Sequence, residues 1–119
     1  MNFFDAINAH VAWKVRLQKH IKGVSDELLD AMVVGRDDLC SLGKWINTNA
    51  DRHGEIPLFR QVQEQHADFH RCAAEIIESA NRGEQVEAEH KLHHDYAHLS
   101  HMIVKSLSRL GKELPEEPL

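Results

Sequence analysis

Ten histidines and two cysteines occur in this chain of 119 residues, and they are the side chains best suited to chemistry. Ordinary globular composition would supply only about two or three histidines in a chain of this length. Neutral imidazole and thiolate are preferred ligands of Zn²⁺ in proteins. Metal binding is therefore the first chemistry to consider, and the question becomes which histidines face the interior.

Three histidines fall on the apolar faces of their predicted helices when successive residues are placed about 100° apart. His10 lies in the middle of an apolar line on the first predicted helix. His66 takes an interior position between Val62 and Phe69, and His70 lies one turn later at the edge of that stripe. An unpartnered buried imidazole costs roughly 1 to 3 kcal/mol, so one shared metal ion would explain all three.

A closed zinc site needs a fourth ligand, and Cys40 is the best candidate. Asp37 or Asp38 can cap a helix here, which would put Cys40 in the first turn, where the helix dipole favours the thiolate. Taken singly, an interior histidine is usually a hydrogen-bonded core residue, and a buried cysteine is usually a small apolar one. The combination favours a metal ion, and the predicted ligands are His10, Cys40, His66 and His70.

The other histidines show no reason to be ligands. His90, His94 and His101 fall about half a turn from the apolar stripe of the last predicted helix, so we expect them to be exposed. The remaining four lie on helix flanks, near a helix end or in a predicted loop: His93, His98, His20 and His53. Cys72 lies at the edge of an apolar stripe and is predicted to be structural.

The elements that must position these residues are all helical, since no strand-like alternation competes with the helical spacing. Gly23, Gly35 and Gly83 separate the predicted helices, and Pro57 suits the first turn of the longest one. The predicted helices span about residues 2–22, 28–34, 39–46, 58–80 and 84–110, with an N-cap signal at 25–27 and a polar loop over 47–55. We therefore expect an all-α fold, an antiparallel four-helix bundle with additional short helices. A single domain is predicted over residues 1–111 and a loose tail over 112–119.

Charge and hydropathy narrow the class of protein. Fourteen basic residues against nineteen acidic ones give a net charge of −5, and the two signs are interleaved, which disfavours nucleic acid as a partner. No apolar run approaches the roughly 18 residues of a membrane span, and the first residues lack the pattern of a signal peptide. Two cysteines do not suggest a disulfide scaffold. We expect a cytoplasmic protein without membrane insertion.

Three sequence blocks carry a family resemblance. They are a His-x-x-Trp segment from His10, a Cys-x-x-Gly-x-Trp segment from Cys40, and a His-x-x-x-His pair at His66 and His70. In this order and spacing they resemble the chemoreceptor zinc-binding domain family, over roughly residues 6–105. The resemblance implies a helical bundle that binds one zinc ion with three histidines and one cysteine, roles that carry over onto these four residues.

The same resemblance implies a function. Members of that family are bacterial sensory modules attached to chemoreceptors and to diguanylate cyclases, and they often work as homodimers. For this chain it implies a non-enzymatic role in signal transduction, with zinc occupancy or oxidation of Cys40 as the input. No output domain fits within the chain, so we expect a free-standing sensor or a piece of a longer receptor.

Three alternatives stay open at this point. A hemerythrin-like di-iron oxygen carrier is also a histidine-rich helix bundle, but it needs bridging carboxylates and more inward histidines than the sequence supplies. A zinc hydrolase would keep three protein ligands and leave one position for water. The third alternative is an interaction bundle that binds no metal.

Overall fold

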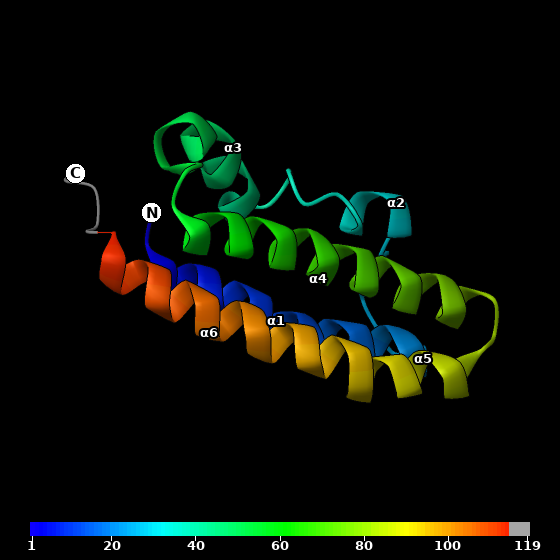
Figure 1. Ribbon diagram of the computed structural model, residues 1–119. Helices are drawn as coiled ribbons and strands as arrows, with labels where there is room; N and C mark the ends of the chain where they lie inside the picture. Colours follow the sequence, from blue (N-terminus) through cyan, green and yellow to red (C-terminus); the bar gives the residue numbers. More distant parts are fainter. Residues whose placement is uncertain (115–119) are drawn as a thin grey trace.

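A computed structural model describes residues 1–114 as a helical bundle (Figure 1). Two long helices, α1 (Phe3–Lys22) and α4 (Pro57–Asn81), run in the same direction. A third stretch runs antiparallel to both, and it consists of α5 (Gln85–Lys91), the π turn η1 (Leu92–Tyr96) and α6 (Ala97–Glu113). The chain returns between α1 and α4 through the short helices α2 (Ala31–Val34) and α3 (Ser41–His53). The predicted all-α bundle is confirmed. Between α1 and α4 in the chain, the short helices α2 and α3 stand in place of one long second helix.

Local signals determine the ends of the long helices. Asn2 caps α1 by accepting a hydrogen bond from the backbone N–H of Asp5 at 3.1 Å, and Gly23 ends it with a φ of +72°. Pro57 occupies the first turn of α4, where its missing N–H removes no helical hydrogen bond. These boundaries agree closely with the predicted ones.

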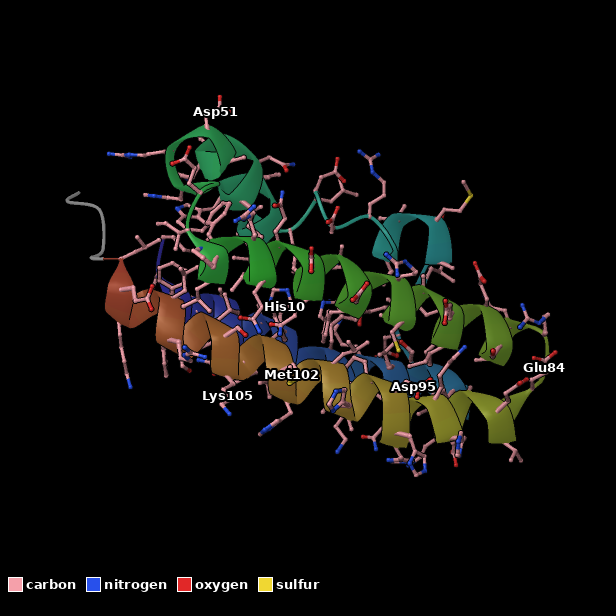
Figure 2. The ribbon with its side chains drawn as sticks, viewed as in Figure 1. His10, Asp51, Glu84, Asp95, Met102 and Lys105 are labelled. Atoms are coloured by element: carbon pink, nitrogen blue, oxygen red, sulfur yellow. The ribbon has the colours of Figure 1, made fainter. Side chains whose placement is uncertain are left out.

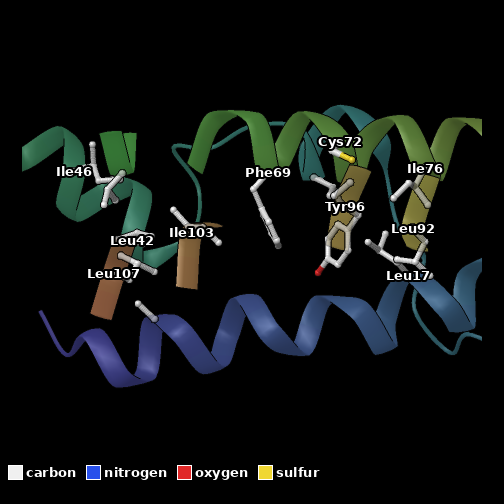
Figure 3. Packing of buried hydrophobic residues seen from close by; sticks show 14 of the residues in the cluster. Leu17, Leu42, Ile46, Phe69, Cys72, Ile76, Leu92, Tyr96, Ile103 and Leu107 are labelled. Atoms are coloured by element: carbon white, nitrogen blue, oxygen red, sulfur yellow. The ribbon is translucent and has the colours of Figure 1, made fainter. Parts of the chain in front are cut away.

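The apolar core runs along the bundle between the three long stretches (Figure 3). Phe69 of α4 is fully buried and contacts the ring of Tyr96, with 5.1 Å between ring centroids. Leu17 of α1 and Leu92 of η1 extend the core towards the far end of the bundle (Figure 3). Each such side chain contributes roughly 1.5 to 3 kcal/mol when it is fully buried, so packing holds the long helices together.

One π turn interrupts the last helical stretch at Leu92–Tyr96. A π turn accommodates an extra residue in the helix, which shifts the faces on its two sides relative to each other. Both Leu92 and Tyr96 are buried, and the Tyr96 hydroxyl donates a hydrogen bond to the His10 carbonyl oxygen at 3.4 Å. The π turn therefore connects the third stretch to α1 beside His10.

The second helix is shorter than predicted. It begins at Ala31 and is capped by Asp30, whose carboxylate accepts a hydrogen bond from the N–H of Met32 at 2.9 Å. Ser25 instead closes a turn by accepting a hydrogen bond from the N–H of Glu27 at 3.0 Å. The predicted start near residue 28 is therefore wrong, because a serine that can cap a helix can equally close an isolated turn.

The third helix differs from the prediction at its beginning. Cys40 itself is the N-cap, and its Sγ accepts a hydrogen bond from the N–H of Gly43 at 3.4 Å. The predicted caps were Asp37 and Asp38, but the Asp38 carboxylate pairs with Arg36 at 2.8 Å. A local ion pair thus removed Asp38 as a cap, and Cys40 took the capping position.

The third helix also ends later than predicted. It continues to His53 through a stretch that was predicted to be a loop over residues 47–55. Ile46 and Asn49 are buried on its inner face, while most of the polar residues around them are exposed. This polar stretch is helical because one inward face is enough to bind it to the bundle.

The last helix runs past Gly111 to Glu113. A Cβ atom at position 111 would lie 3.3 Å from the Cβ of Phe3, so this glycine serves a close approach between helices instead of ending one. Of the predicted tail over 112–119, residues 115–119 lie outside the described residues. The domain boundary at residue 111 stays a prediction. Within residues 1–114, no helix combines the length and the apolar character that crossing a membrane requires.

Candidate metal centre

The four predicted ligand residues come together where α1, α4 and the start of α3 meet. One ligand atom from each of His10, Cys40, His66 and His70 lies within 4.8 Å of all the others. Figure 2 shows His10 near the middle of the bundle. Across residues 1–114, this is the one group of three or more histidine, cysteine or acidic side chains whose ligand atoms gather so closely.

Backbone carbonyl groups orient two of the three imidazoles. The Nδ1 of His10 donates to the carbonyl oxygen of Ala6 at 2.7 Å, one turn earlier on α1. The Nδ1 of His70 donates to the carbonyl oxygen of Val34 at 2.8 Å, at the end of α2. Because a carbonyl can only accept, Nδ1 carries the proton and the Nε2 lone pair is available. Metal-binding histidines typically have this arrangement.

The distances fit a tetrahedral ion. The Sγ of Cys40 lies 3.2 Å from the Nε2 of His66 and 3.7 Å from the Nε2 of His70. The two Nε2 atoms are 3.0 Å apart. Tetrahedral zinc with ordinary bond lengths would put its nitrogen ligands about 3.3 Å apart and its sulfur and nitrogen ligands about 3.6 Å apart. The Nε2 of His10 is buried without a hydrogen-bond partner, which a metal ion would supply.

Burial sets the protonation of the histidines. The exposed fractions of His10, His66 and His70 are 2%, 1% and 3%. Burial lowers the pKa of each imidazole, because water no longer stabilises the charged form. The pKa of His66 falls to about 3, with a further contribution from His70 and His10. All three rings are therefore neutral near pH 7, which is the form that binds metal.

The protonation of Cys40 differs from the prediction. Burial raises the pKa of its thiol and outweighs the opposing effect of the Gly43 N–H that points at the sulfur. The predicted effect of the helix start is present, since the N–H groups of Gly43 and Leu42 lower the pKa, but desolvation of the charged form outweighs it in the metal-free environment. Cys40 would hold a cation as the thiolate, so binding of a metal ion here would be coupled to loss of the thiol proton.

Gly43 explains the Cys-x-x-Gly spacing, and its role was not identified in the sequence. A Cβ atom at position 43 would overlap the carbonyl oxygen of Asp37, so only glycine lets the segment at Asp37 pack this closely on the start of α3. The same residue donates its N–H to the Sγ of Cys40. The fixed spacing to Cys40 was the signal that could have revealed this role.

The histidines that were predicted to be exposed lie outside the group. His90, His94 and His101 are exposed on the α5–α6 stretch, together with His93 and His98. His20 is hydrogen-bonded to Asn81 through its Nε2 at 2.8 Å. His53 lies in the last turn of α3 instead of a loop, half-buried against the rings of Trp45 and Phe59.

The two cysteines differ in environment, and neither forms a disulfide. Cys72 is buried in the core cluster, as predicted for a structural residue. Burial and the carboxylates of Glu75 and Asp95 raise the pKa of its thiol to about 11. In the metal-free protein, Cys72 is therefore a protonated and weakly reactive thiol at neutral pH.

A groove of about 920 Å³ opens beside the metal centre, between α1 and the segment of residues 27–42. Trp13 contributes to its wall, and the Arg16 guanidinium lies over that ring at 3.7 Å from the centroid. His10, Cys40 and His70 form part of the groove lining. A small molecule in the groove could therefore reach the centre, including its sulfur atom.

Comparison with known proteins agrees with this geometry. A family model described as Chemoreceptor zinc-binding domain matches residues 10–77. The matched span begins at His10 and contains all four residues of the group. No curated protein and no solved structure matches the chain.

Proposed function

This chain belongs to the chemoreceptor zinc-binding domain family, and we propose that it is a sensory domain that binds one Zn²⁺ through His10, Cys40, His66 and His70. The observation that carries the proposal is that one ligand atom from each of the four residues gathers at one place. The Nε2 of His10 is buried there without a hydrogen-bond partner. Three neutral imidazoles and one cysteine thiolate are ligands of the types that bind zinc, and four of them suffice for a closed tetrahedral site. When bound, the ion would supply the charge that stabilises the Cys40 thiolate.

The ligands come from three helices that also pack on one another through the core. His10 comes from α1, His66 and His70 come from α4, and Cys40 is the N-cap of α3. His70 also donates a hydrogen bond from its Nδ1 to the carbonyl oxygen of Val34 in α2. The four residues thus attach the segment of residues 31–46 to the two parallel helices of the bundle. Loss of a ligand at the metal centre would therefore alter the structure of that segment first.

Oxidation of Cys40 is the input that we favour. Its sulfur lines the groove beside α1, which supports access by a small oxidant such as a peroxide. The thiolate sulfur would attack one peroxide oxygen, form the sulfenic acid, and release the other oxygen as hydroxide. The sulfur then loses its negative charge and binds a cation more weakly, which would release the start of α3.

The proposed role is regulatory and not catalytic. With Cys40 as the fourth ligand the coordination shell would be closed, and no position would remain for the water molecule that a zinc hydrolase activates. No carboxylate belongs to the group, so the bridging ligands of a hemerythrin-like di-iron site are missing from it. We propose that the domain acts in signal transduction such as chemotaxis, in the cytoplasm, on an output partner such as a chemoreceptor or a diguanylate cyclase.

We further propose that the domain works as a homodimer. Phe4, Val11 and Val15 line one outward face of α1 and are 70%, 50% and 52% exposed. Such an apolar line on a small domain supports self-association. Sedimentation equilibrium should show a dimer that Phe4→Glu converts to monomer, and a monomeric unsubstituted protein would contradict this.

Metal quantitation of the purified protein tests the zinc proposal. We expect one tightly bound zinc per chain, and a large loss of affinity in Cys40→Ala, His66→Ala and His10→Ala. Cys72→Ser is the matched control, because it changes the other cysteine and should keep the tight ion. A Cys40→Ala protein that binds zinc as tightly as the original and responds identically to peroxide would refute the redox switch. Two irons per chain with an oxo-bridge absorbance would instead support the di-iron alternative.

A further inference from the structure

A second set of metal-ligating side chains lines a groove between α4 and the π turn. The groove has a volume of about 710 Å³ and is open to solvent. Three histidines, three carboxylates and one thiol line it. Cys72 and Glu75 come from α4, and His94, Asp95 and His98 come from η1 and the start of α6. None of these residues belongs to the centre described above.

The fold places the two histidines on one side of their helix. His94 and His98 are four residues apart, which is the spacing of His66 and His70 on α4. Both line the same groove, although the π turn changes the helical phase at this point. Asp95 lies between them in sequence and is labelled in Figure 2. It makes no ion pair with any residue in the part of the chain that the structure describes.

Cys72 adds an independent observation. Its side chain is only 6% exposed, its thiol is free, and it lines this groove from the α4 side. No hydrogen-bond partner for its sulfur occurs among residues 1–114. Figure 3 shows Cys72 beside Tyr96, at the level of the π turn. A buried sulfur without a partner, at the wall of a groove that also holds imidazoles, is a potential metal ligand.

Arg71 lines the groove and Lys91 lies outside its lining, and both of these basic side chains are already engaged in ion pairs. Lys91 pairs with Glu75 at 2.9 Å, and Arg71 pairs with Asp68 at 3.0 Å. These ion pairs lie beside the histidines and leave Asp95 as a carboxylate without a salt-bridge partner. The groove therefore offers imidazole, carboxylate and sulfur donors to an incoming cation.

We propose that this groove is an outer metal site that binds Zn²⁺, or a similar borderline divalent cation, through His94 and His98 with Asp95 and Cys72 as further donors. The ligand atoms are not gathered as they are in the inner centre, so the side chains must rotate to converge on an ion. Restriction of these exposed side chains to one rotamer costs conformational entropy. The outer site therefore binds at least about tenfold more weakly than the inner centre and fills after it.

Calorimetric titration of Zn²⁺ into protein that already holds one zinc ion per chain tests the outer site. We expect a second equivalent in the unsubstituted protein, with an affinity that falls at least about tenfold in the double variant His94→Gln/His98→Gln. His101→Gln is the matched control, because His101 is exposed on the same helix outside the groove. A single equivalent at all zinc concentrations overturns the proposal, and so does unchanged binding in the double variant or equal loss in the control.

A second measurement reports on the sulfur. Zinc in the inner centre is spectroscopically silent, so Co²⁺ added to the zinc-loaded protein should show thiolate-to-cobalt charge-transfer absorbance only if Cys72 binds it. Cys72→Ser should abolish this absorbance, whereas His101→Gln should leave it intact. A band that persists in Cys72→Ser, or no band at all, overturns the assignment of this thiol. Failure of the inner centre would show separately, because the purified protein would then not hold one zinc ion per chain before the titration.

Discussion

Two of the His-x-x-x-His pairs in this chain, His66/His70 and His94/His98, have the same spacing and opposite environments. His66 and His70 on α4 are 1% and 3% exposed and face His10 and Cys40. His94 and His98 are exposed at the rim of an open groove. The spacing only places two rings on one side of a helix. Whether they form a preformed site depends on what the neighbouring helices bring to the same point.

Support from the backbone is the second difference between the two regions. Carbonyl groups of Ala6 and Val34 hold the rings of His10 and His70 in the tautomer that binds metal. In residues 1–114, neither His94 nor His98 has a comparable hydrogen bond to the backbone. The inner region is therefore preorganised, whereas the outer region must be organised by its ligand.

Removal of the inner metal ion should destabilise the protein most. An ion present at about 1,000 times its dissociation constant stabilises the folded state by about 4 kcal/mol. Calorimetry with a strong chelator should therefore lower the melting temperature by more than about 10 °C. Amide hydrogen exchange should increase first in residues 31–46, which the centre attaches to the bundle. An unchanged melting temperature would instead support a bundle that binds no metal.

Gly43→Ala should weaken zinc binding although residue 43 is not a ligand. The new methyl group would overlap the Asp37 carbonyl and displace Cys40 from the histidines. Overpacking of this kind typically costs about 1 to 3 kcal/mol, which corresponds to roughly a tenfold to hundredfold loss of affinity. Competition with a chromophoric chelator measures it, with the exposed Ser41→Ala as control. Equal zinc affinities in both variants would show that the inner centre tolerates displacement of the segment at Asp37.

Tyr96→Phe should have a smaller effect that separates the fold from the centre. The substitution removes the hydroxyl that donates to the His10 carbonyl at 3.4 Å. Loss of one such hydrogen bond typically costs about 0.5 to 1.5 kcal/mol of unfolding free energy. Urea denaturation of the zinc-loaded protein should show this loss, while zinc affinity stays nearly unchanged. A large drop in affinity would mean that the π turn helps to position His10.

His101→Gln should have the smallest effect. His101 is exposed and lies outside both the inner group and the outer groove. Surface substitutions of this kind usually change stability by less than about 0.5 kcal/mol. Denaturant unfolding and zinc titration should both match the unsubstituted protein. A measurable loss of stability or of zinc affinity would mean that an exposed histidine outside both sites contributes to the fold or to metal binding.

Helical periodicity predicted the long elements and their inner faces well. The ends of α1 and α4 follow from residues that act locally, such as Asn2, Gly23 and Pro57. Capping was less predictable in the return segment, where Ser25 and Asp38 found other partners and Asp30 and Cys40 became the caps. A short polar side chain satisfies a nearby donor in several ways, and packing decides between them.

Residue types at a fixed angular period are enough to predict the helices and the faces that they bury. The same periodicity predicts that His10, His66 and His70 point inward. Only the tertiary structure decided that Cys40 meets them and that burial keeps its metal-free thiol protonated. It also decided that Cys72 shares a groove with His94 and His98, which no local pattern indicated. The physical reason is that contacts and desolvation depend on how separate helices pack, whereas periodicity describes each helix on its own.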